Sequence, residues 1–397
     1  MGAKLTVEDL DVVGKRVLVR VDFNVPQDEK LAITDDTRIR EALRTIKYLL
    51  ERRAKVILVS HLGRPKGKVS DKLRLDPVAK RLSELLGQPV IKANDVVGDD
   101  AKAKVGALGE GQVLLLENVR FEAGEEANDE GLSKALASMA DLYVNDAFGT
   151  AHRAHASTAG VARFVSQAAA GFLLVKELEY LDKIVQNPER PFTALLGGAK
   201  VSSKLSVIRN LLDKVDNLLI GGGMSYTFLR AMNMEVGSSL VEEDMIKEAK
   251  EIIKLAVDKH VKWLLPFDHV VTDKVAPDAA TQIVTREGIG PGLMAVDIGP
   301  KTVEMFSNVM EKSKTIIWNG PMGIFEMGPF AQGTYAIAKK MASLSATTIV
   351  GGGDSVAAIN RLGLASKFTH ISTGGGASLE MLEGLVLPGV AALTDRK

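Results

Sequence analysis

Cysteine is absent from the 397 residues of the chain. Its absence excludes disulfide bonds, iron–sulfur clusters, thiolate zinc sites and a cysteine nucleophile. A chain without cysteine also fits a reducing compartment, where disulfides do not persist.

Long hydrophobic runs and net charge are also missing. No apolar run reaches the ~20 residues of a membrane span, and residues 1–16 are too polar for a signal peptide. Fifty Lys and Arg residues balance fifty Asp and Glu residues, so the formal net charge is zero. This balance argues against a polybasic nucleic-acid or membrane-surface binder, although it allows a local basic pocket. We expect a cytoplasmic protein without a nucleic-acid or membrane partner.

Several familiar catalytic motifs are absent as well. The run from Gly63 to Lys68 is one residue too short for a phosphate-binding P-loop and lacks its Ser or Thr. No G-x-G-x-x-G, G-x-S-x-G or H-E-x-x-H sequence occurs. The chain is therefore not an ordinary P-loop enzyme. Only the doubly wound pattern and the glycine-rich turns of the sequence favour a nicotinamide-dependent oxidoreductase.

Short apolar runs alternate with amphipathic helical stretches along most of the chain. Continuous hydrophobicity over four to eight residues is typical of strands buried on both faces of a parallel sheet. The expected strands are Val17–Phe23, Val56–Ser60, Val113–Glu117, Leu142–Asn145, Ala194–Gly197, Leu218–Gly221, Trp263–Pro266, Thr315–Trp318, Thr347–Gly351 and Thr369–Ser372. Between them lie helical patterns such as Arg38–Arg53, in which apolar residues share one face.

This alternation predicts an α/β fold with right-handed crossovers. A (β/α)₈ barrel would use the same pattern, but ten strands and the chain length favour two open, doubly wound (Rossmann-like) parallel sheets. The segment from Phe172 reads as one helix that ends at Asn187-Pro188. We expect an N-terminal domain over residues 1–170, an interdomain helix over 171–186 and a C-terminal domain over 187–376. Residues 377–397 are expected to return to the hinge and the N-terminal domain, and a deep cleft is expected between the domains.

Cationic and polar side chains follow the expected strands of the first half. Ligands of open parallel sheets bind beyond the carboxyl ends of the strands, so these residues are candidates for one site. They are Asp22, Phe23, Asn24, Arg38, His61, Leu62, Gly63, Arg64, Arg120, His152 and Arg153. Any single arginine could be a surface residue, but four at successive strand ends predict a small ligand with several negative charges.

Glycines occupy the same positions in the second half. The clusters are Gly197–Lys200, Gly221–Gly223, Gly320–Gly323, Gly351–Asp354 and Gly374–Gly376. Glycine lets backbone N–H groups approach phosphates, and a helix N-terminus adds unpaired donors. Lys200 and Lys204 could meet phosphate oxygens. Asp354 could be a magnesium ligand or a plain helix N-cap, and the sequence leaves both open.

These residues resemble the phosphoglycerate kinase family. The stretch from Arg16 to Pro26 is similar to the family signature, and further segments follow in the family's order. They read SHLGRP, ENVRF, NDAFGTAHRAHAS, GGAKVSSK, GGGMSYTF, WNGPMGIFE, GGGDS and STGGGASLE. The resemblance spans essentially the whole chain.

The resemblance implies a role for each matching residue. It places 3-phosphoglycerate or 1,3-bisphosphoglycerate in the N-terminal domain, at Asp22, Phe23, Asn24, Arg38, His61, Leu62, Gly63, Arg64, Arg120 and Arg153. It places ATP or ADP at Gly198, Ala199, Lys204, Gly222, Ala295, Asn319, Pro321, Glu326, Gly352, Gly353, Asp354 and Ser355. Gly374 and Gly375 would stabilise the phosphates, Asp354 would reach Mg²⁺, and Arg38 and Lys200 would be catalytic. Two positions depart from the usual pattern, since Ala295 replaces a common Gly and Ser203 a frequent acidic residue.

The reaction implied is direct in-line phosphoryl transfer between 1,3-bisphosphoglycerate and Mg-ADP, with hinge closure around the interdomain helix. The family also implies a monomer. Two alternatives remain from the sequence, an NAD-dependent oxidoreductase and a non-catalytic nucleotide- or anion-binding protein. The second should lack Arg38 or Lys200, and both are present.

Overall fold

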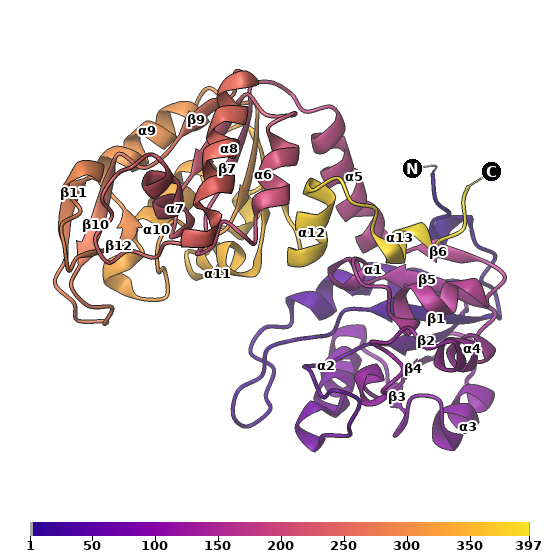
Figure 1. Cartoon of the computed structure of the whole chain (residues 1–397). Coiled ribbons are helices and arrows are strands. Elements are labelled where there is room, and N and C mark those ends of the chain that lie inside the picture. Colours follow the sequence, from indigo (N-terminus) through magenta and orange to yellow (C-terminus); the bar gives the residue numbers. More distant parts are fainter. Residues whose placement is uncertain (1–2, 397) are drawn as a thin grey trace. The chain divides into compact units, whose positions relative to one another are not determined.

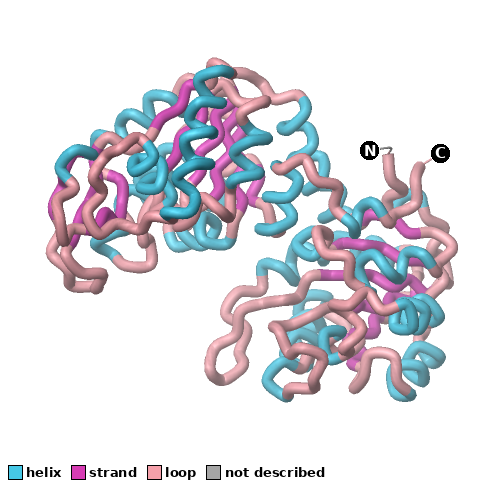
Figure 2. The backbone as a smooth tube through the Cα atoms, viewed as in Figure 1, coloured by secondary structure: helices cyan, strands magenta, loops and turns pink. Residues whose placement is uncertain are grey.

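The computed structural model describes residues 3–396, apart from the side chains of residues 182–186. The chain forms two compact units. Unit 1 comprises Met1–Glu179 and Val386–Lys397, and unit 2 comprises Tyr180–Leu385. In each unit the strands lie between helices (Figures 1 and 2). None of the helices in the described part of the chain is long and apolar enough to cross a bilayer.

Unit 1 contains a six-stranded parallel sheet. Its strands are β1 (Arg16–Val21), β2 (Lys55–Val59), β3 (Val90–Lys92), β4 (Val113–Leu115), β5 (Leu142–Asp146) and β6 (Ala168–Ala170). They are arranged in the order β3-β4-β2-β1-β5-β6. The chain moves outward from β1 on one side and returns to the other side at β5, so the order reverses between β1 and β5. This reversal is where an open α/β sheet places its ligand.

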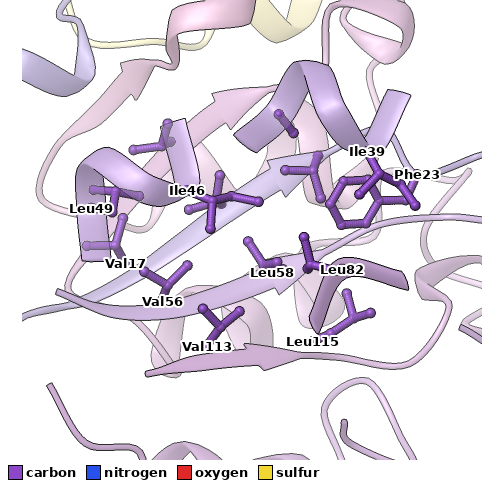
Figure 3. Close-up of a cluster of buried hydrophobic side chains, with 14 of the residues drawn as sticks. Val17, Phe23, Ile39, Ile46, Leu49, Val56, Leu58, Leu82, Val113 and Leu115 are labelled. Carbon is purple, nitrogen blue, oxygen red and sulfur yellow. The ribbon is translucent and has the colours of Figure 1, made fainter. Parts of the chain in front are cut away.

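Helices cover both faces of this sheet. They are α1 (Thr37–Glu51), α2 (Asp76–Leu86), α3 (Asp99–Ala107), α4 (Glu130–Ser138) and the first part of α5 (Phe172–Gln186). Figure 3 shows α1 side chains such as Ile46 and Leu49 against alternate residues of the strands, among them Val17 and Val56. The intervening residue Leu18 is buried on the opposite face. Both faces are apolar, which explains the unbroken hydrophobic runs.

Unit 2 contains a second six-stranded parallel sheet. Its strands are β7 (Phe192–Leu196), β8 (Asn217–Ile220), β9 (Lys262–Leu264), β13 (Thr315–Asn319), β14 (Thr347–Gly351) and β15 (His370–Ile371). Read from β9, the order is β9-β8-β7-β13-β14-β15, which is the Rossmann order with its reversal between β7 and β13. The fold class predicted from the sequence is therefore confirmed.

The helices of unit 2 complete its layers. They are α6 (Leu205–Leu211), α7 (Met224–Ala231), α8 (Ile246–Asp258), α9 (Pro300–Met310), α10 (Gln332–Ala342), α11 (Gly353–Arg361) and α12 (Gly375–Leu382). Helices α9, α10 and α11 share one core with the sheet, built around Phe306, Trp318 and Ile337. All three side chains are fully buried.

A small antiparallel sheet was not predicted. It consists of β10 (Asp268–Thr272), β11 (Gln282–Thr285) and β12 (Met294–Ile298), in the order β11-β10-β12. The short strands β3 and β6 were also not predicted. All ten strands that were predicted are present, with ends that differ by a few residues.

Helix α5 runs from Phe172 to Gln186, as the sequence pattern indicates, and the two units divide within it. The side chains of residues 182–186 lie outside the described residues, and with them part of the expected hinge. On the C-terminal side the units divide at residue 385, whereas residue 376 was expected, because α12 belongs to unit 2. Helix α13 (Pro388–Ala391) packs in unit 1, where the Asn145 side-chain amide donates to the Gly389 carbonyl at 3.1 Å.

The core of unit 1 yields a matched pair of valine substitutions. Val17 is fully buried in β1, whereas Val13 is 60% exposed just before it. Val17→Ala should destabilise unit 1 by about 2–3 kcal/mol, because two buried methyl groups and their contacts are lost. Val13→Ala should change it by less than about 0.5 kcal/mol.

Hydrogen exchange of the β1 and β2 amides measures the change in the stability of unit 1 in each variant. In Val17→Ala their exchange should quicken roughly 30- to 150-fold. Equal rates in the two variants would contradict the assignment of this face to the core.

Candidate functional site

Unit 1 gathers four guanidinium groups around the carboxyl ends of its strands. Arg20 lies in β1, Arg38 in the first turn of α1, Arg120 in the 3-10 turn Val119–Phe121 after β4, and Arg153 beyond β5. We call these four residues the arginine cluster. Three of them were predicted as site residues, together with Arg64, whose side chain is exposed and makes no ion pair with the described residues.

Asp22, directly after β1, binds one arginine of this cluster and the loop that follows β1. Its Oδ2 accepts a hydrogen bond from Arg38 Nη1 at 2.7 Å, and its Oδ1 accepts from the Asn24 backbone N–H at 3.1 Å. Asn24 Oδ1 in turn accepts from the Gly63 N–H at 2.9 Å. The loops after β1 and β2 are thus joined by short polar contacts, and the structure brings Asp22, Asn24, Arg38 and Gly63 together.

Arg120 and Asn118 fix the third loop of the site. Arg120 Nη1 donates to the Gly63 carbonyl at 2.8 Å, while Arg120 Nε lies 3.2 Å from Glu126 Oε1. The buried Asn118 amide donates to the Leu62 carbonyl at 2.7 Å and accepts from the Leu62 N–H at 3.2 Å. Phe23, also buried, donates its N–H to Ser60 Oγ at 2.9 Å. These contacts hold the backbone around Leu62 and Gly63 beneath the guanidinium groups.

The pKa of His61 is affected by the charges of the whole arginine cluster. The imidazole is 3% exposed, and its pKa is held well below its ordinary value, first by burial and then by nearby positive charge. The charges belong to Arg20, Arg120, Arg38 and Arg153. Because all four act on one ring, they form a single cationic site, and His61 is neutral within it.

Arg20 was not among the predicted site residues. It is 1% exposed, and its Nε donates to Ser157 Oγ at 2.8 Å while its Nη2 lies 3.2 Å from His61 Nδ1. Ser157 Oγ donates to Glu125 Oε1 at 2.6 Å. A charged residue inside an otherwise apolar strand run was the available signal, since a buried charge requires partners.

The corresponding edge of unit 2 is made of glycine backbone. At the reversal between β7 and β13, the Gly198 N–H donates to the Pro321 carbonyl at 2.9 Å, and the Gly222 N–H donates to the Met322 carbonyl at 3.1 Å. A Cβ on Gly320 would lie 2.3 Å from the Gly197 carbonyl oxygen. We call the segments 197–199, 221–223, 320–323, 351–353 and 374–376 the glycine loops. Gly197, Gly222 and Gly320 have no side chains, which lets these loops pack closely against one another.

A buried lysine and an unpaired amide lie at this edge. Lys204 Nζ donates to Asn319 Oδ1, and burial lowers the pKa of Lys204 to about 8, although Asp354 acts to raise it. Asn319 Nδ2 is buried without a partner among the described residues, and a Cβ on Gly352 would lie 3.1 Å from it. An unpaired buried donor beside a lysine suits an anionic ligand.

Two helices begin next to each other here. Helix α11 starts at Gly353 and α12 at Gly375, and a Cβ on Gly375 would lie 4.0 Å from the Gly353 nitrogen. Ser355 Oγ accepts from the Gly320 N–H at 2.8 Å, which ties the start of α11 to the loop after β13. Helix N-termini carry unpaired N–H groups and a positive dipole end, so both favour anions.

Three predicted residues have no described contact with these loops. Ala295 is buried in β12, where its N–H donates to Ser239 Oγ at 2.9 Å. The side chains of Glu326 and Lys200 are exposed and make no hydrogen bond or ion pair within the described part of the chain. Ala199, between Gly198 and Lys200, is exposed as well. Their roles stay predictions.

Cavity size does not point to the arginine cluster or to the glycine loops. A cavity of about 500 Å³ in unit 1 is lined by residues 30–33 and by α2 residues such as Lys80 and Arg81, none of which belongs to the arginine cluster. Two cavities of about 420 Å³ each share Lys262, Val309 and Lys312 in unit 2. One is lined by residues at the amino ends of β7, β8 and β9, such as Pro191 and Asn217, and the other by residues of β9 and α9. The glycine loops lie at the carboxyl ends of the same sheet, so the assignment of the site rests on chemistry and topology.

The two doubly wound units, one with an arginine cluster and the other with glycine loops, define a phosphotransferase. The model of the phosphoglycerate kinase family matches residues 7–385. The phosphoglycerate kinase of Synechococcus elongatus is 61% identical over 396 residues, covering 99% of this chain and 98% of the relative. The phosphoglycerate kinase of Moorella thermoacetica is 59% identical over 394 residues, covering 99% and 100%. The chain belongs to the phosphoglycerate kinase family.

Solved structures agree with this. The structure of phosphoglycerate kinase from Coxiella burnetii has a TM-score of 0.88 at 41% identity, and that from Pyrococcus horikoshii has 0.85 at 34%. In both cases 98% of each chain is covered. The two-domain fold and the enzyme class are thereby established together.

Two glycines with the same backbone conformation test the close packing of the glycine loops. Gly222 has φ +67° and a Cβ there would lie 2.6 Å from the Gly198 nitrogen, whereas Gly363 has φ +65° and open space around it. Both alanine variants carry the left-handed strain of about 1–2 kcal/mol. Gly222→Ala should lose about 2 kcal/mol more, because the loop at Gly198 must move. Thermal unfolding compares them, and equal melting temperatures would show that the loops are not tightly packed.

Proposed function

We propose that this protein catalyses reversible transfer of a phosphoryl group from 1,3-bisphosphoglycerate to Mg-ADP, giving 3-phosphoglycerate and ATP. The acceptor in the reverse direction is the substrate carboxyl group. The observation that carries this proposal is the convergence of four guanidinium groups on His61 in a member of the phosphoglycerate kinase family. Guanidinium groups bind carboxylate and phosphate oxygens in pairs, which suits a ligand that carries both.

The arginine cluster and the loops around it would hold the phosphoglycerate. Arg38, Arg64, Arg120 and Arg153 would neutralise its charges, with Asp22, Asn24 and His61 supplying hydrogen bonds to the polar groups between them. The contact between Asp22 and Arg38 supports this role, because it holds the guanidinium at the edge of the site until an anion competes for it. Phe23, Leu62 and Gly63 would contribute backbone and shape.

The glycine loops would hold the nucleotide. The Gly352 backbone and the N-termini of α11 and α12 suit phosphates. Gly198, Gly222 and Pro321, whose backbone groups already pair within the loops, would shape the site, and Glu326 and Ala295 would meet the ribose and the base. Lys204, Asn319 and Ser355 would contact phosphate oxygens. The unpaired Asn319 amide supports this assignment, because a ligand oxygen would give it a partner.

Asp354 would hold the magnesium ion that accompanies the nucleotide. It is exposed in the first turn of α11, and the described residues contain no group of three His, Cys, Asp or Glu side chains able to cage a metal. One carboxylate fits an ion that is carried mainly by substrate phosphates and water, which is the usual binding mode of Mg²⁺. When bound, the ion would neutralise phosphate charge.

Catalysis would consist of alignment and charge neutralisation. In-line transfer needs no covalent enzyme intermediate, so the residues must hold the two reacting groups and exclude water. Alignment alone can be worth about 7–11 kcal/mol. Arg38 from unit 1 and Lys200 from unit 2 would bracket the transferring group, which requires hinge closure of the two units during the reaction. We further propose that the enzyme is a cytoplasmic monomer.

A coupled assay with 3-phosphoglycerate and Mg-ATP tests the proposed function. Turnover is expected with these substrates and not with nicotinamide cofactors, which would dispose of the oxidoreductase alternative. A protein that bound Mg-ATP and 3-phosphoglycerate without turnover would be the non-catalytic binder.

Arg38→Ala and Lys200→Ala should each lower kcat about 10³-fold or more, because each removes a positive charge from the transferring group. Arg40→Ala and Lys254→Ala are the matched controls. Arg40 lies one half-turn further along α1 and pairs with Asp36 at 2.8 Å, and Lys254 is exposed on α8. The controls should keep near-normal kcat, and steady-state kinetics at saturating substrate compares all four. Near-normal turnover in Arg38→Ala and Lys200→Ala would show the catalytic assignment to be wrong.

Nucleotide binding should take up protons at alkaline pH. The pKa of Lys204 is lowered to about 8 by burial, so at pH 8.5 much of this amine is neutral in the free protein. Nucleotide phosphates favour the charged form and raise the pKa, so binding draws a proton from the buffer. Calorimetry of ADP binding in two buffers of different ionisation enthalpy measures the uptake.

The uptake should disappear in Lys204→Arg, whose guanidinium is charged at every pH used. At pH 7 it should be small in the wild type, because Lys204 is already protonated. Buffer-independent binding of ADP by the wild type at pH 8.5 would mean that Lys204 does not face the phosphates.

A further inference from the structure

His61 has one nitrogen in the protein interior and one free for a ligand. Nδ1 lies 3.2 Å from Arg20 Nη2 and 4.0 Å from Asp22 Oδ1. Nε2 makes no hydrogen bond to any residue in the described ranges. Which nitrogen carries the proton therefore decides whether the ring offers its ligand a donor or an acceptor.

The hydrogen-bond chain behind Arg20 fixes its orientation. Arg20 Nε donates to Ser157 Oγ at 2.8 Å, and the same hydroxyl donates to Glu125 Oε1 at 2.6 Å. Glu125 Oε2 also accepts from the Ser157 N–H at 2.9 Å. Arg20 Nη1 donates to the Val21 carbonyl. Glu125, Ser157 and Arg20 are all buried, and two partners, Ser157 Oγ and the Val21 carbonyl, hold the guanidinium in place.

A guanidinium has donors and no acceptor. The contact between Arg20 Nη2 and His61 Nδ1 can therefore be a hydrogen bond only if Nδ1 accepts it. An Nδ1–H would turn this contact into two opposed donors, and Asp22 Oδ1, 4.0 Å away, is too distant to accept a hydrogen bond from it. A doubly protonated ring meets the same conflict, and the positive charges of Arg38, Arg120 and Arg153 disfavour it further.

We propose that Arg20 is a positioning residue that keeps His61 in the neutral tautomer with its proton on Nε2. His61 then offers the ligand a single neutral N–H donor, while the positive charge of the site comes from the arginines alone. This inference rests on the proposed function for the identity of the ligand, an oxygen acceptor of a phosphorylated acid. The tautomer itself does not depend on that function.

Nitrogen-15 NMR of the histidine side chains tests the tautomer in the intact protein. The chain has six histidines, so the His61 signals are assigned by their loss in His61→Gln. In the wild type, Nδ1 should have the shift of an unprotonated nitrogen and Nε2 that of a protonated one, unchanged from pH 8 to pH 6. A wild-type His61 with its proton on Nδ1, or charged at pH 7, would overturn the proposal.

Substitutions on one strand then separate Arg20 from general effects on β1. Arg20→Met removes the donor, so Nδ1 becomes free to protonate, and the ring should change tautomer or titrate between pH 6 and 8. Arg16→Met is the matched control, since Arg16 lies on the same strand and pairs with Asp141 at 2.7 Å. Its His61 signals should match the wild type. Unchanged signals in a folded Arg20→Met would also contradict the proposal.

Kinetics provide a second readout. The KM for 3-phosphoglycerate should rise about 10-fold or more in Arg20→Met and acquire a pH dependence between pH 6 and 8 that the wild type lacks, with a smaller change in kcat. Arg20→Lys, which keeps a cationic donor, should restore part of the effect. If the protein showed no phosphoglycerate kinase activity while the wild-type tautomer was as stated, the proposed function would fail and the positioning role would stand. If the activity were present and Nδ1 carried the proton, the positioning role alone would fail.

Discussion

Mutual repulsion among the guanidinium groups is the constraint on which unit 1 depends. Four positive charges act on one buried imidazole, and the pKa of Arg120 is itself lowered by burial, with Arg153 and Arg20 adding to the effect. Such a cluster persists because acidic partners are built in around it. Asp22 holds Arg38, Glu126 lies beside Arg120, and Glu125 lies behind Arg20 through Ser157. The compensation is incomplete, so the site retains positive charge for an anionic ligand.

The edge of unit 2 is also suited to anions, but no cluster of arginines lies among its described residues. Its edge has few charged side chains, and favourable interactions with anions come from helix N-termini, backbone amides and one partly desolvated lysine. Close packing of the glycine loops makes this possible, since a Cβ on Gly197 would lie 2.2 Å from the Pro321 carbonyl oxygen. Burial lowers the pKa of Lys204 to about 8, so its charge changes near that pH, whereas arginine charge is fixed. The arginines of unit 1 keep their positive charge at every ordinary pH, whereas Lys204 of unit 2 can lose its proton.

The sequence predicted the parts of the fold that follow from strong local patterns. Strands such as β1 and β14 are buried on both faces, and their unbroken apolar runs distinguish them from the amphipathic helices. Of the strands that were missed, β11 (QIVT) is largely exposed, with Ile283 61% exposed, and β10 (DHVVT) mixes polar with apolar residues. Beta structure of that kind depends on neighbouring strands more than on its own residues. Strand β12 (MAVDI) is an apolar run of ordinary strand length that the sequence analysis did not assign. Strands β3 and β6 are as short as β4 and β9, which were predicted, but β3 (VIK) is only half-buried and β6 (AAA) has no large apolar side chain.

The sequence also predicted only those site residues that follow from local patterns. Residues just beyond strand ends, such as Asp22 and Arg120, were found because parallel strands bring their carboxyl ends to one edge. Arg20 lies within a strand, and its importance depends on contacts with Ser157 and His61, which are 137 and 41 residues away. No local pattern encodes such pairs. The roles of Glu326, Ala295 and Lys200 rest on family resemblance, because their side chains make no described contact with the glycine loops.

The return of residues 386–396 to unit 1 affects the order in which the protein can be made. The Leu5 N–H donates to the Thr394 carbonyl at 2.9 Å and the Gly389 N–H to the Ala151 carbonyl at 2.8 Å, so early and late parts of the chain complete one structure. Translation proceeds from the N-terminus, and every residue of unit 2 is synthesised before this last segment. Unit 1 can therefore be completed only after all of unit 2 has been synthesised. For this chain, the unit that begins first is the one that is completed last.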